Sequence, residues 1–144
     1  MLDRLLGLLG GTTAAPRELP SEQLAVALLL LELARSDFDF PEVERIKIRD
    51  LLAQRYQLDA AGADALLQQA QALEQEAVSL YDYVQALNAR LDPRAKREVM
   101  EMLWQLAYAD GRLDKYEESL LRKLAGLLYV SDEDYIRAKL SVTG

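Results

Sequence analysis

One stretch near the C-terminus decides how the chain is interpreted, and it reads Ala107-Tyr108-Ala109-Asp110-Gly111-Arg112-Leu113-Asp114-Lys115-Tyr116-Glu117. An earlier stretch has the same layout and reads Ala34-Arg35-Ser36-Asp37-Phe38-Asp39-Phe40-Pro41-Glu42-Val43-Glu44. In each, an Asp follows one apolar segment, and a Glu stands where the next apolar segment begins. The two stretches predict that the same helix–loop–helix corner occurs twice.

The likeness extends well beyond these corners. When residues 24–69 are shifted by 73 positions onto residues 97–142, 12 of 46 positions are identical. The identical pairs are Val26/Val99, Leu30/Leu103, Leu33/Leu106, Ala34/Ala107, Asp37/Asp110, Glu44/Glu117, Arg49/Arg122, Leu51/Leu124, Tyr56/Tyr129, Asp59/Asp132, Ala65/Ala138 and Leu67/Leu140. Some leucines and alanines match by chance in a chain rich in both, but the shared acids, Arg and Tyr are harder to attribute to chance. We interpret the pattern as an internal duplication of a helix–loop–helix–helix unit.

Composition narrows the class of protein. The chain has 144 residues, half of them hydrophobic, with few glycines and prolines, which is typical of one helical domain. It contains neither cysteine nor histidine, so disulfides, thiolate metal sites and the commonest general base are excluded. A net charge of −7 argues against nucleic-acid binding, which depends on neutralising phosphates. The composition therefore favours a protein that is not an enzyme, located in the cytoplasm.

The first 20 residues form a separate segment in this interpretation. Residues 1–10 predict a short amphipathic helix, and residues 10–16 a turn or linker. Its apolar stripe consists of Leu2, Leu5, Leu6 and Leu9. Two alternatives are open: the stripe docks on the main body, or it is a weak anchor for a partner or a membrane. Membrane association would then be at most peripheral, because the longest apolar run, residues 24–31, is eight residues against about 20 needed to span a bilayer.

Capping signals divide residues 21–144 into helices. The expected helix starts are Ser21, Pro41, Asp59, Ser79 with Asp82, Asp92-Pro93, Asp114 with Glu117, and Ser131 with Asp134. The expected inward stripes are Val26, Leu30 and Leu33; Ile48, Leu51 and Leu52; Val99, Leu103 and Leu106; and Leu121, Leu124 and Leu128. Short loops between these segments predict an all-α fold, a seven- to eight-helix bundle with a pseudo-two-fold repeat.

Four carboxylates continue these apolar stripes. Asp37 and Asp110 follow their stripes at helical spacing, and Glu44 and Glu117 precede theirs. An acid in the last turn of a helix opposes the macrodipole, and burying it costs a few kcal/mol, about 1–3 by mutational data, unless it is compensated. Asp37 and Asp110 therefore require a partner.

Three hypotheses supply one. In the first, loop N–H groups bond the aspartates and lock each corner shut, with Arg49 and Arg122 as counter-ions. In the second, the two corners face one another, and Asp37, Glu44, Asp110 and Glu117 bind a hard cation such as Ca²⁺, Mg²⁺ or Mn²⁺. In the third, the same cluster activates water as a metal-dependent hydrolase, although no nucleophile–base pair or phosphate loop accompanies it.

The pattern Ala-x-x-Asp-Gly-x-Leu-x-x-x-Glu at residues 107–117, with its degenerate upstream copy, resembles the TerB family of tellurite-resistance proteins. The resemblance covers about residues 21–142 and implies a helical bundle with internal pseudo-two-fold symmetry. The family's acidic positions fall on Asp37, Glu44, Asp110 and Glu117. The first copy departs from the pattern, because Phe38 stands where the second has Gly111 and Pro41 where it has Asp114.

The resemblance also implies a role. TerB-like proteins are cytoplasmic and bacterial, and they are linked to stress and tellurite responses. They are thought to work with a membrane-bound Ter-type partner rather than as enzymes. We therefore expect this chain to act through protein–protein interaction.

Overall fold

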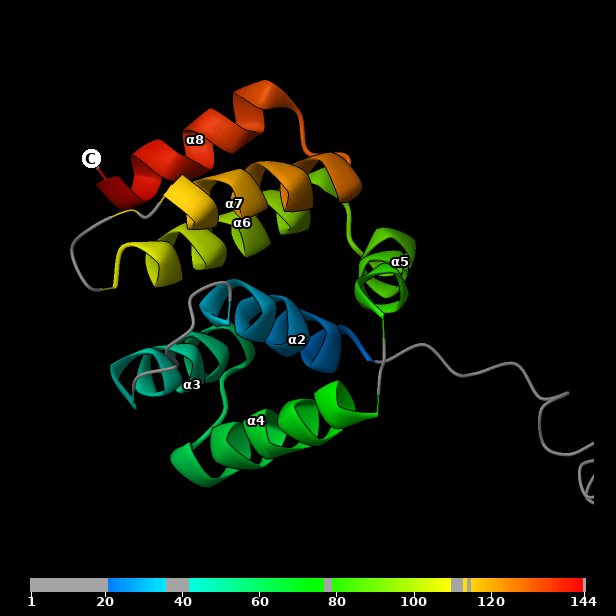
Figure 1. Cartoon of the computed structure of the whole chain (residues 1–144), viewed down its shortest axis with the longest axis vertical. Helices are drawn as coiled ribbons and strands as arrows, with labels where there is room; N and C mark the ends of the chain where they lie inside the picture. The colour runs from blue at the N-terminus through cyan, green and yellow to red at the C-terminus, as the bar shows by residue number, and fades with distance from the viewer. Residues whose placement is uncertain (1–20, 36–41, 77–78, 110–112, 114, 144) are drawn as a thin grey trace, which may run out of the picture.

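Residues 21–35, 42–76, 79–109, 113 and 115–143 are described by the computed structural model (Figure 1). In this part of the chain the regular structure is entirely helical. The helices are α2 (Glu22–Ala34), α3 (Glu42–Tyr56), α4 (Ala60–Gln75), α5 (Leu80–Arg90), α6 (Pro93–Ala107), α7 (Lys115–Leu127) and α8 (Asp132–Thr143). The predicted all-α bundle is confirmed. The segment predicted as an N-terminal amphipathic helix with its linker, residues 1–20, lies outside the described residues.

The predicted helix caps are confirmed wherever they are described. Ser21 accepts a hydrogen bond from the N–H of Leu24 at 3.3 Å, which starts α2. Ser79 and Asp82 form the reciprocal capping box at the start of α5. Asp92 caps α6, with Pro93 in its first turn. These side chains accept hydrogen bonds from N–H groups that have no partner inside the helix. The capped helices therefore begin where their cap residues stand in the sequence.

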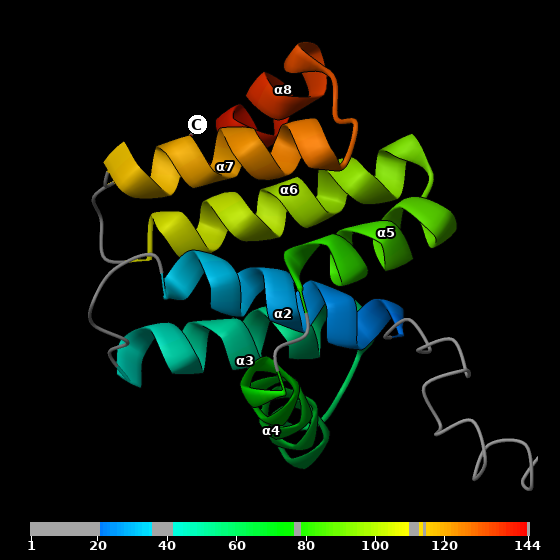
Figure 2. The ribbon, with the colours of Figure 1, turned by 45° about the vertical axis from the view of Figure 1, so that its right-hand side comes forward.

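Helix α2 occupies the centre of the molecule. Every residue from Ala25 to Leu31 is completely buried, and α2 packs against α3, α4, α5, α6 and α7 (Figure 2). The sequence predicted one inward stripe on this helix, and that prediction was too narrow. Four consecutive leucines, Leu28 to Leu31, project in all directions around a helix, so such a segment is stable only when it is enclosed.

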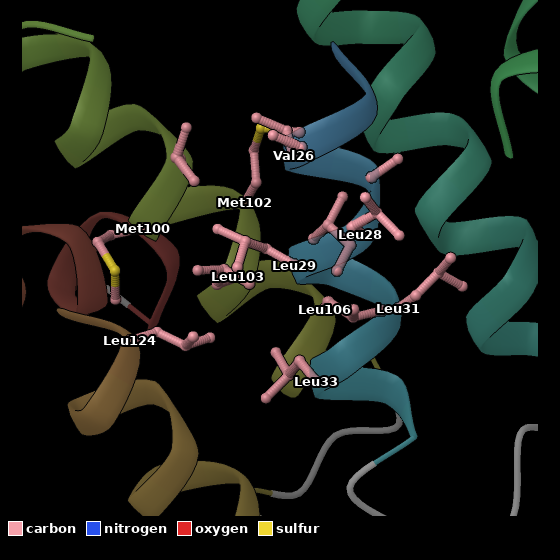
Figure 3. Close-up of a cluster of buried hydrophobic side chains, with 14 of the residues drawn as sticks. Val26, Leu28, Leu29, Leu31, Leu33, Met100, Met102, Leu103, Leu106 and Leu124 are labelled. Atoms are coloured by element: carbon pink, nitrogen blue, oxygen red, sulfur yellow. The ribbon is translucent and has the colours of Figure 1, made fainter. Parts of the chain in front are cut away.

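The core between the two halves is made by α2 and α6. Figure 3 shows Leu29 of α2 beside Leu103 of α6, and Val26 beside Met102. Leu28 and Leu31 lie on the opposite side of α2, which faces α3. The core is therefore continuous from α3 through α2 to α6 and α7.

The duplication is visible in the helix boundaries. Shifting α2 and α3 by 73 residues makes the end of α2 coincide with the end of α6, and the start of α3 with the start of α7. Equivalent helices run in the same direction, so α2 and α6 end, and α3 and α7 begin, at one end of the molecule (Figures 1 and 2). Both corners are therefore built at the same end.

The repeat loses one residue after the second helix of each unit. Each helix is followed by a residue of positive φ, Gln57 at 54° directly after α3 and Tyr129 at 58° two residues after α7, and these are 72 positions apart. In each case the next N–H bonds a carbonyl five residues back, at 3.0 Å from Leu58 and 2.9 Å from Val130. The pairings Tyr56/Tyr129, Asp59/Asp132 and Leu67/Leu140, taken from the sequence at an offset of 73, are therefore one residue out of register.

The third helix of each unit shows the consequence. Asp59 and Ser131, at an offset of 72, are the equivalent N-caps of α4 and α8. Leu67 is completely buried, whereas Leu140 is 55% exposed. The leucine identity at the offset of 73 therefore does not reflect equivalent environments.

This register makes a matched prediction. Leu67→Ala should lower the free energy of unfolding by about 2–5 kcal/mol, because it leaves a cavity in the core. Leu140→Ala should change it by no more than about 0.5 kcal/mol, because half of that side chain is already in water. Denaturant unfolding of both variants measures the difference. Equal losses of unfolding free energy would show that Leu67 and Leu140 are equivalent positions, as the offset of 73 implies.

Candidate functional site

Glu44 and Glu117 occupy equivalent positions in the first turns of α3 and α7. Their exposed fractions are 7% and 4%, and among the described residues they are the only buried charged side chains. Each precedes an inward residue by four positions, Ile48 in α3 and Leu121 in α7, both fully buried. The prediction that these two acids point to the apolar side of their helices is confirmed.

The local electrostatics favour a carboxylate at these positions. The N-terminal turn of a helix carries partial positive charge from N–H groups without intrahelical partners. Both glutamates also take part in interactions within the molecule. Their burial is therefore compensated at least in part by their position in the fold.

The other two predicted ligands, Asp37 and Asp110, lie outside the described residues. Within the described ranges, no three Asp, Glu, His or Cys side chains are grouped closely enough to hold a metal ion. The structure does place Glu44 and Glu117 at the same end of the bundle, where α2 and α6 end (Figure 2). The four-carboxylate site remains a prediction.

Both predicted counter-ions, Arg49 and Arg122, contact other side chains among the described residues. Arg49 lies 3.6 Å from a carboxylate oxygen of Asp50 and 3.9 Å from one of Asp64. The guanidinium of Arg122 lies over the ring of Tyr135, 4.9 Å from its centre. These contacts link α3 with α4 and α7 with α8. Because Asp37 and Asp110 lie outside the described residues, the pairing of these arginines with the corner acids stays a prediction.

A groove runs between α3 and α6, which we call the α3–α6 groove. One section has a volume of 260 Å³ and is lined by Leu51, Gln54, Arg55, Glu98, Glu101, Met102 and Gln105. The next section has a volume of 440 Å³ and is lined by Val43, Ile46, Lys47, Asp50, Gln105, Tyr108, Ala109 and Val142. Gln105 lines both, so the two sections adjoin along α3 and α6. Arg55 and Glu98 form an ion pair of 3.2 Å at one end, while the other end has the exposed apolar side chains Val43 and Ile46 among polar ones.

The sequence analysis did not identify this groove. Val43 and Ile46 are 55% and 39% exposed, and they lie on a different face of α3 from Ile48 and Leu51. The sequence did contain a signal for it. Val43 and Ile46 are apolar, stand three positions apart and do not belong to the inward stripe of α3.

The comparisons with known proteins agree with this architecture. The model of the family described as "Tellurite resistance protein TerB" matches residues 23–140, which is most of the chain. The chain belongs to the TerB family. The match includes nearly all of both copies of the repeat. Of the seven helices described, it omits only Glu22 of α2 and the last three residues of α8.

The remaining comparisons add no further relative. No curated protein matches this TerB-family chain, and no solved structure does.

Of the helices described, none is both long enough and apolar enough to cross a bilayer.

A set of partly buried polar contacts lies where α2, α4 and α5 meet. Arg35 bonds the carboxylate of Glu74 at 2.9 Å. Burial raises the pKa of Glu74, and the charge of Glu32 raises it further, against the opposing effect of Arg35. Burial also raises the pKa of Tyr83 to about 12, with further contributions from the charges of Glu32, Glu74 and Asp82.

Tyr56 is the corresponding polar contact between α2 and α3. Its hydroxyl donates a hydrogen bond of 2.8 Å to Glu22. Burial, this bond and the charge of Glu22 raise the pKa of Tyr56 above its ordinary value. The raised pKa values mean that folding favours the neutral phenol of Tyr56 and of Tyr83 over the ionised form.

These shifts predict a loss of stability in alkaline solution. A group with a raised pKa in the folded state releases its proton first in the unfolded chain, so unfolding becomes more favourable once the pH exceeds the unfolded value. For Tyr83 the loss should begin near pH 10.0 and continue to about 12. Tyr83→Phe should flatten this decline, as measured by denaturant unfolding across that range. Tyr81→Phe, at an exposed position in α5, is the control and should keep the wild-type profile.

Proposed function

We propose that this TerB-family chain is a non-enzymatic module of a tellurite-resistance or stress response, which acts in the cytoplasm by binding a protein partner. We further propose that its two corners hold a hard divalent cation through Asp37, Glu44, Asp110 and Glu117. The observation that carries the proposal is the burial of Glu44 and Glu117 at equivalent positions of the repeat, at one end of the molecule.

The chemistry of the donor set supports a hard cation. The four groups offer only carboxylate oxygens, and the chain has no histidine or cysteine to attract a softer metal. Oxygen donors of this kind suit Ca²⁺, Mg²⁺ or Mn²⁺. A bound cation would offset the mutual repulsion of acids gathered in one place, and it would hold the two halves of the duplication together.

The alternative is a structural lock. In that case the acids are satisfied by hydrogen bonds within their own corners, and the module is a scaffold without a metal. Both hypotheses require Glu44 and Glu117 to be buried, so burial alone does not separate them. The response of the folded state to added cation does.

The proposal predicts that cations stabilise the fold. A cation at 100 times its dissociation constant should raise the free energy of unfolding by about 2.7 kcal/mol, which is a shift of several degrees in melting temperature for a domain of this size. Chelator-stripped protein melted with and without Ca²⁺, Mg²⁺ and Mn²⁺ measures this shift. Asp110→Asn and Glu117→Gln should each reduce or abolish it.

Glu118→Gln is the matched control, because Glu118 neighbours Glu117 in the same helical turn but is not buried. It should retain the full response. If no cation shifts the melting temperature of the wild type, or if Asp110→Asn responds as the wild type does, the acids are structural locks.

The partner is proposed to be a protein, such as a membrane-bound Ter-type protein. The exposed apolar side chains of the α3–α6 groove support an interaction role, because apolar residues gathered on a rim of polar ones are typical of protein-binding surfaces. The affinity would come from helix packing in this groove rather than from charge, since the groove carries acids and bases in similar numbers.

A further inference from the structure

The α3–α6 groove has the dimensions of a binding site for one short helix. Along α3 it extends from Val43 to Arg55, twelve residue steps, which correspond to about 18 Å of helix. Ten residues in a helix span about 15 Å. A helix of that size would lie along the groove against both α3 and α6 without projecting far beyond either end.

The groove also has apolar side chains along its length, among polar ones, against which a leucine stripe can pack. Leu51 and Met102 are nearly buried in one section, and Val43 and Ile46 are exposed in the other. Val142 of α8 completes the apolar end. An amphipathic helix that lays apolar side chains at a spacing of three and four residues into a groove is a recurrent mode of recognition.

The chain itself carries a segment of that description. Leu2, Leu5, Leu6 and Leu9 have the spacing of one helical face. These residues lie outside the described part of the chain, and they are joined to it at Ser21.

The point of attachment lies at one end of the groove. Glu22, the first residue of α2, accepts the hydrogen bond of Tyr56, which is the neighbour of Arg55 in the groove. Ten residues lie between Gly10 and Ser21, and these eleven residue steps span up to about 35 Å when extended, so the segment reaches any part of the groove. A tether of this length gives an effective concentration in the millimolar range.

We propose that residues 1–10 of this same chain dock in the α3–α6 groove through the stripe of Leu2, Leu5, Leu6 and Leu9. The segment thereby covers the apolar surface that a partner would otherwise contact. A partner helix of similar pattern then competes with it for the groove.

A second groove among the described residues is less suitable because it is shorter. It has a volume of 410 Å³ and lies between α5 and the end of α7. Along α5 it extends from Tyr81 to Asn88, seven residue steps, which correspond to about 10 Å and are less than the length of a ten-residue helix. It serves as the reference surface for the test.

The absence of cysteine from the chain makes disulfide trapping a clean test. One cysteine replaces Asp3, beside the leucine stripe, and a second replaces Asp50, an exposed residue of the groove. The reference pair combines Asp3→Cys with Gln85→Cys, an exposed residue of the α5–α7 groove. Under mild oxidation of dilute full-length protein, the groove pair should close an intramolecular disulfide about tenfold faster or more, because docking raises the effective concentration above that of a free tether.

Two further variants separate docking from mere proximity. Leu5→Ser with Leu6→Ser should slow the groove pair to the rate of the reference pair and leave the reference pair unchanged. Arg4→Gln, on the opposite side of the predicted helix, should leave both rates unchanged.

Three outcomes overturn the proposal. Equal rates for the two pairs would mean that the segment does not prefer the groove. A groove-pair rate that is insensitive to the serine substitutions would mean that the leucine stripe does not hold it there. Disulfide-linked dimers as the main product, formed faster at higher protein concentration, would assign the groove to a second copy of the chain.

Discussion

The fold depends on the enclosure of α2. Seven consecutive residues of this helix, from Ala25 to Leu31, are completely buried, so it has no face that water can solvate. Each buried leucine contributes about 1.5–3 kcal/mol relative to exposure, and this gain is available only when neighbours surround the helix on every side. The other helices are arranged around this requirement: α3 and α4 cover one side, α5 and α6 another, and α7 closes the remainder.

The duplication explains why that arrangement has two similar corners. In the second unit α6 is the equivalent of α2. Unlike α2, α6 has a polar face in contact with water, near Arg97 and Glu101. The two equivalent helices lie side by side and run in the same direction, so their following loops emerge at one end. A tandem repeat packed in this way places equivalent acids at the same end of the molecule, without any direct signal in the sequence that they are near one another.

The sequence predicted the local features of the fold better than its global ones. Caps such as Ser79 with Asp82 were predictable because their chemistry is local. The complete burial of α2 was not, because periodicity shows a helix's most apolar face but not how many neighbours surround it. The change of register at Gln57 and Tyr129 escaped detection because two non-glycine residues adopt positive φ there. At the candidate site, the inward direction of Glu44 and Glu117 followed from helical spacing. The contacts of Arg49 with Asp64 and of Arg122 with Tyr135 did not, because they depend on side chains of other helices.

The two proposed sites share parts of the chain, and this has a thermodynamic consequence. Val43 lines the α3–α6 groove and directly precedes Glu44, while Ala109 lines the same section and directly precedes Asp110. A cation held at the corners would therefore order the backbone next to the apolar end of the groove. Linkage is reciprocal, so whatever change in groove affinity the cation causes, the occupant of the groove causes in cation affinity by the same factor. If both sites exist, the parts of the chain through which the cation response and the occupancy of the groove would be coupled are the first turn of α3 and the residues directly after α6.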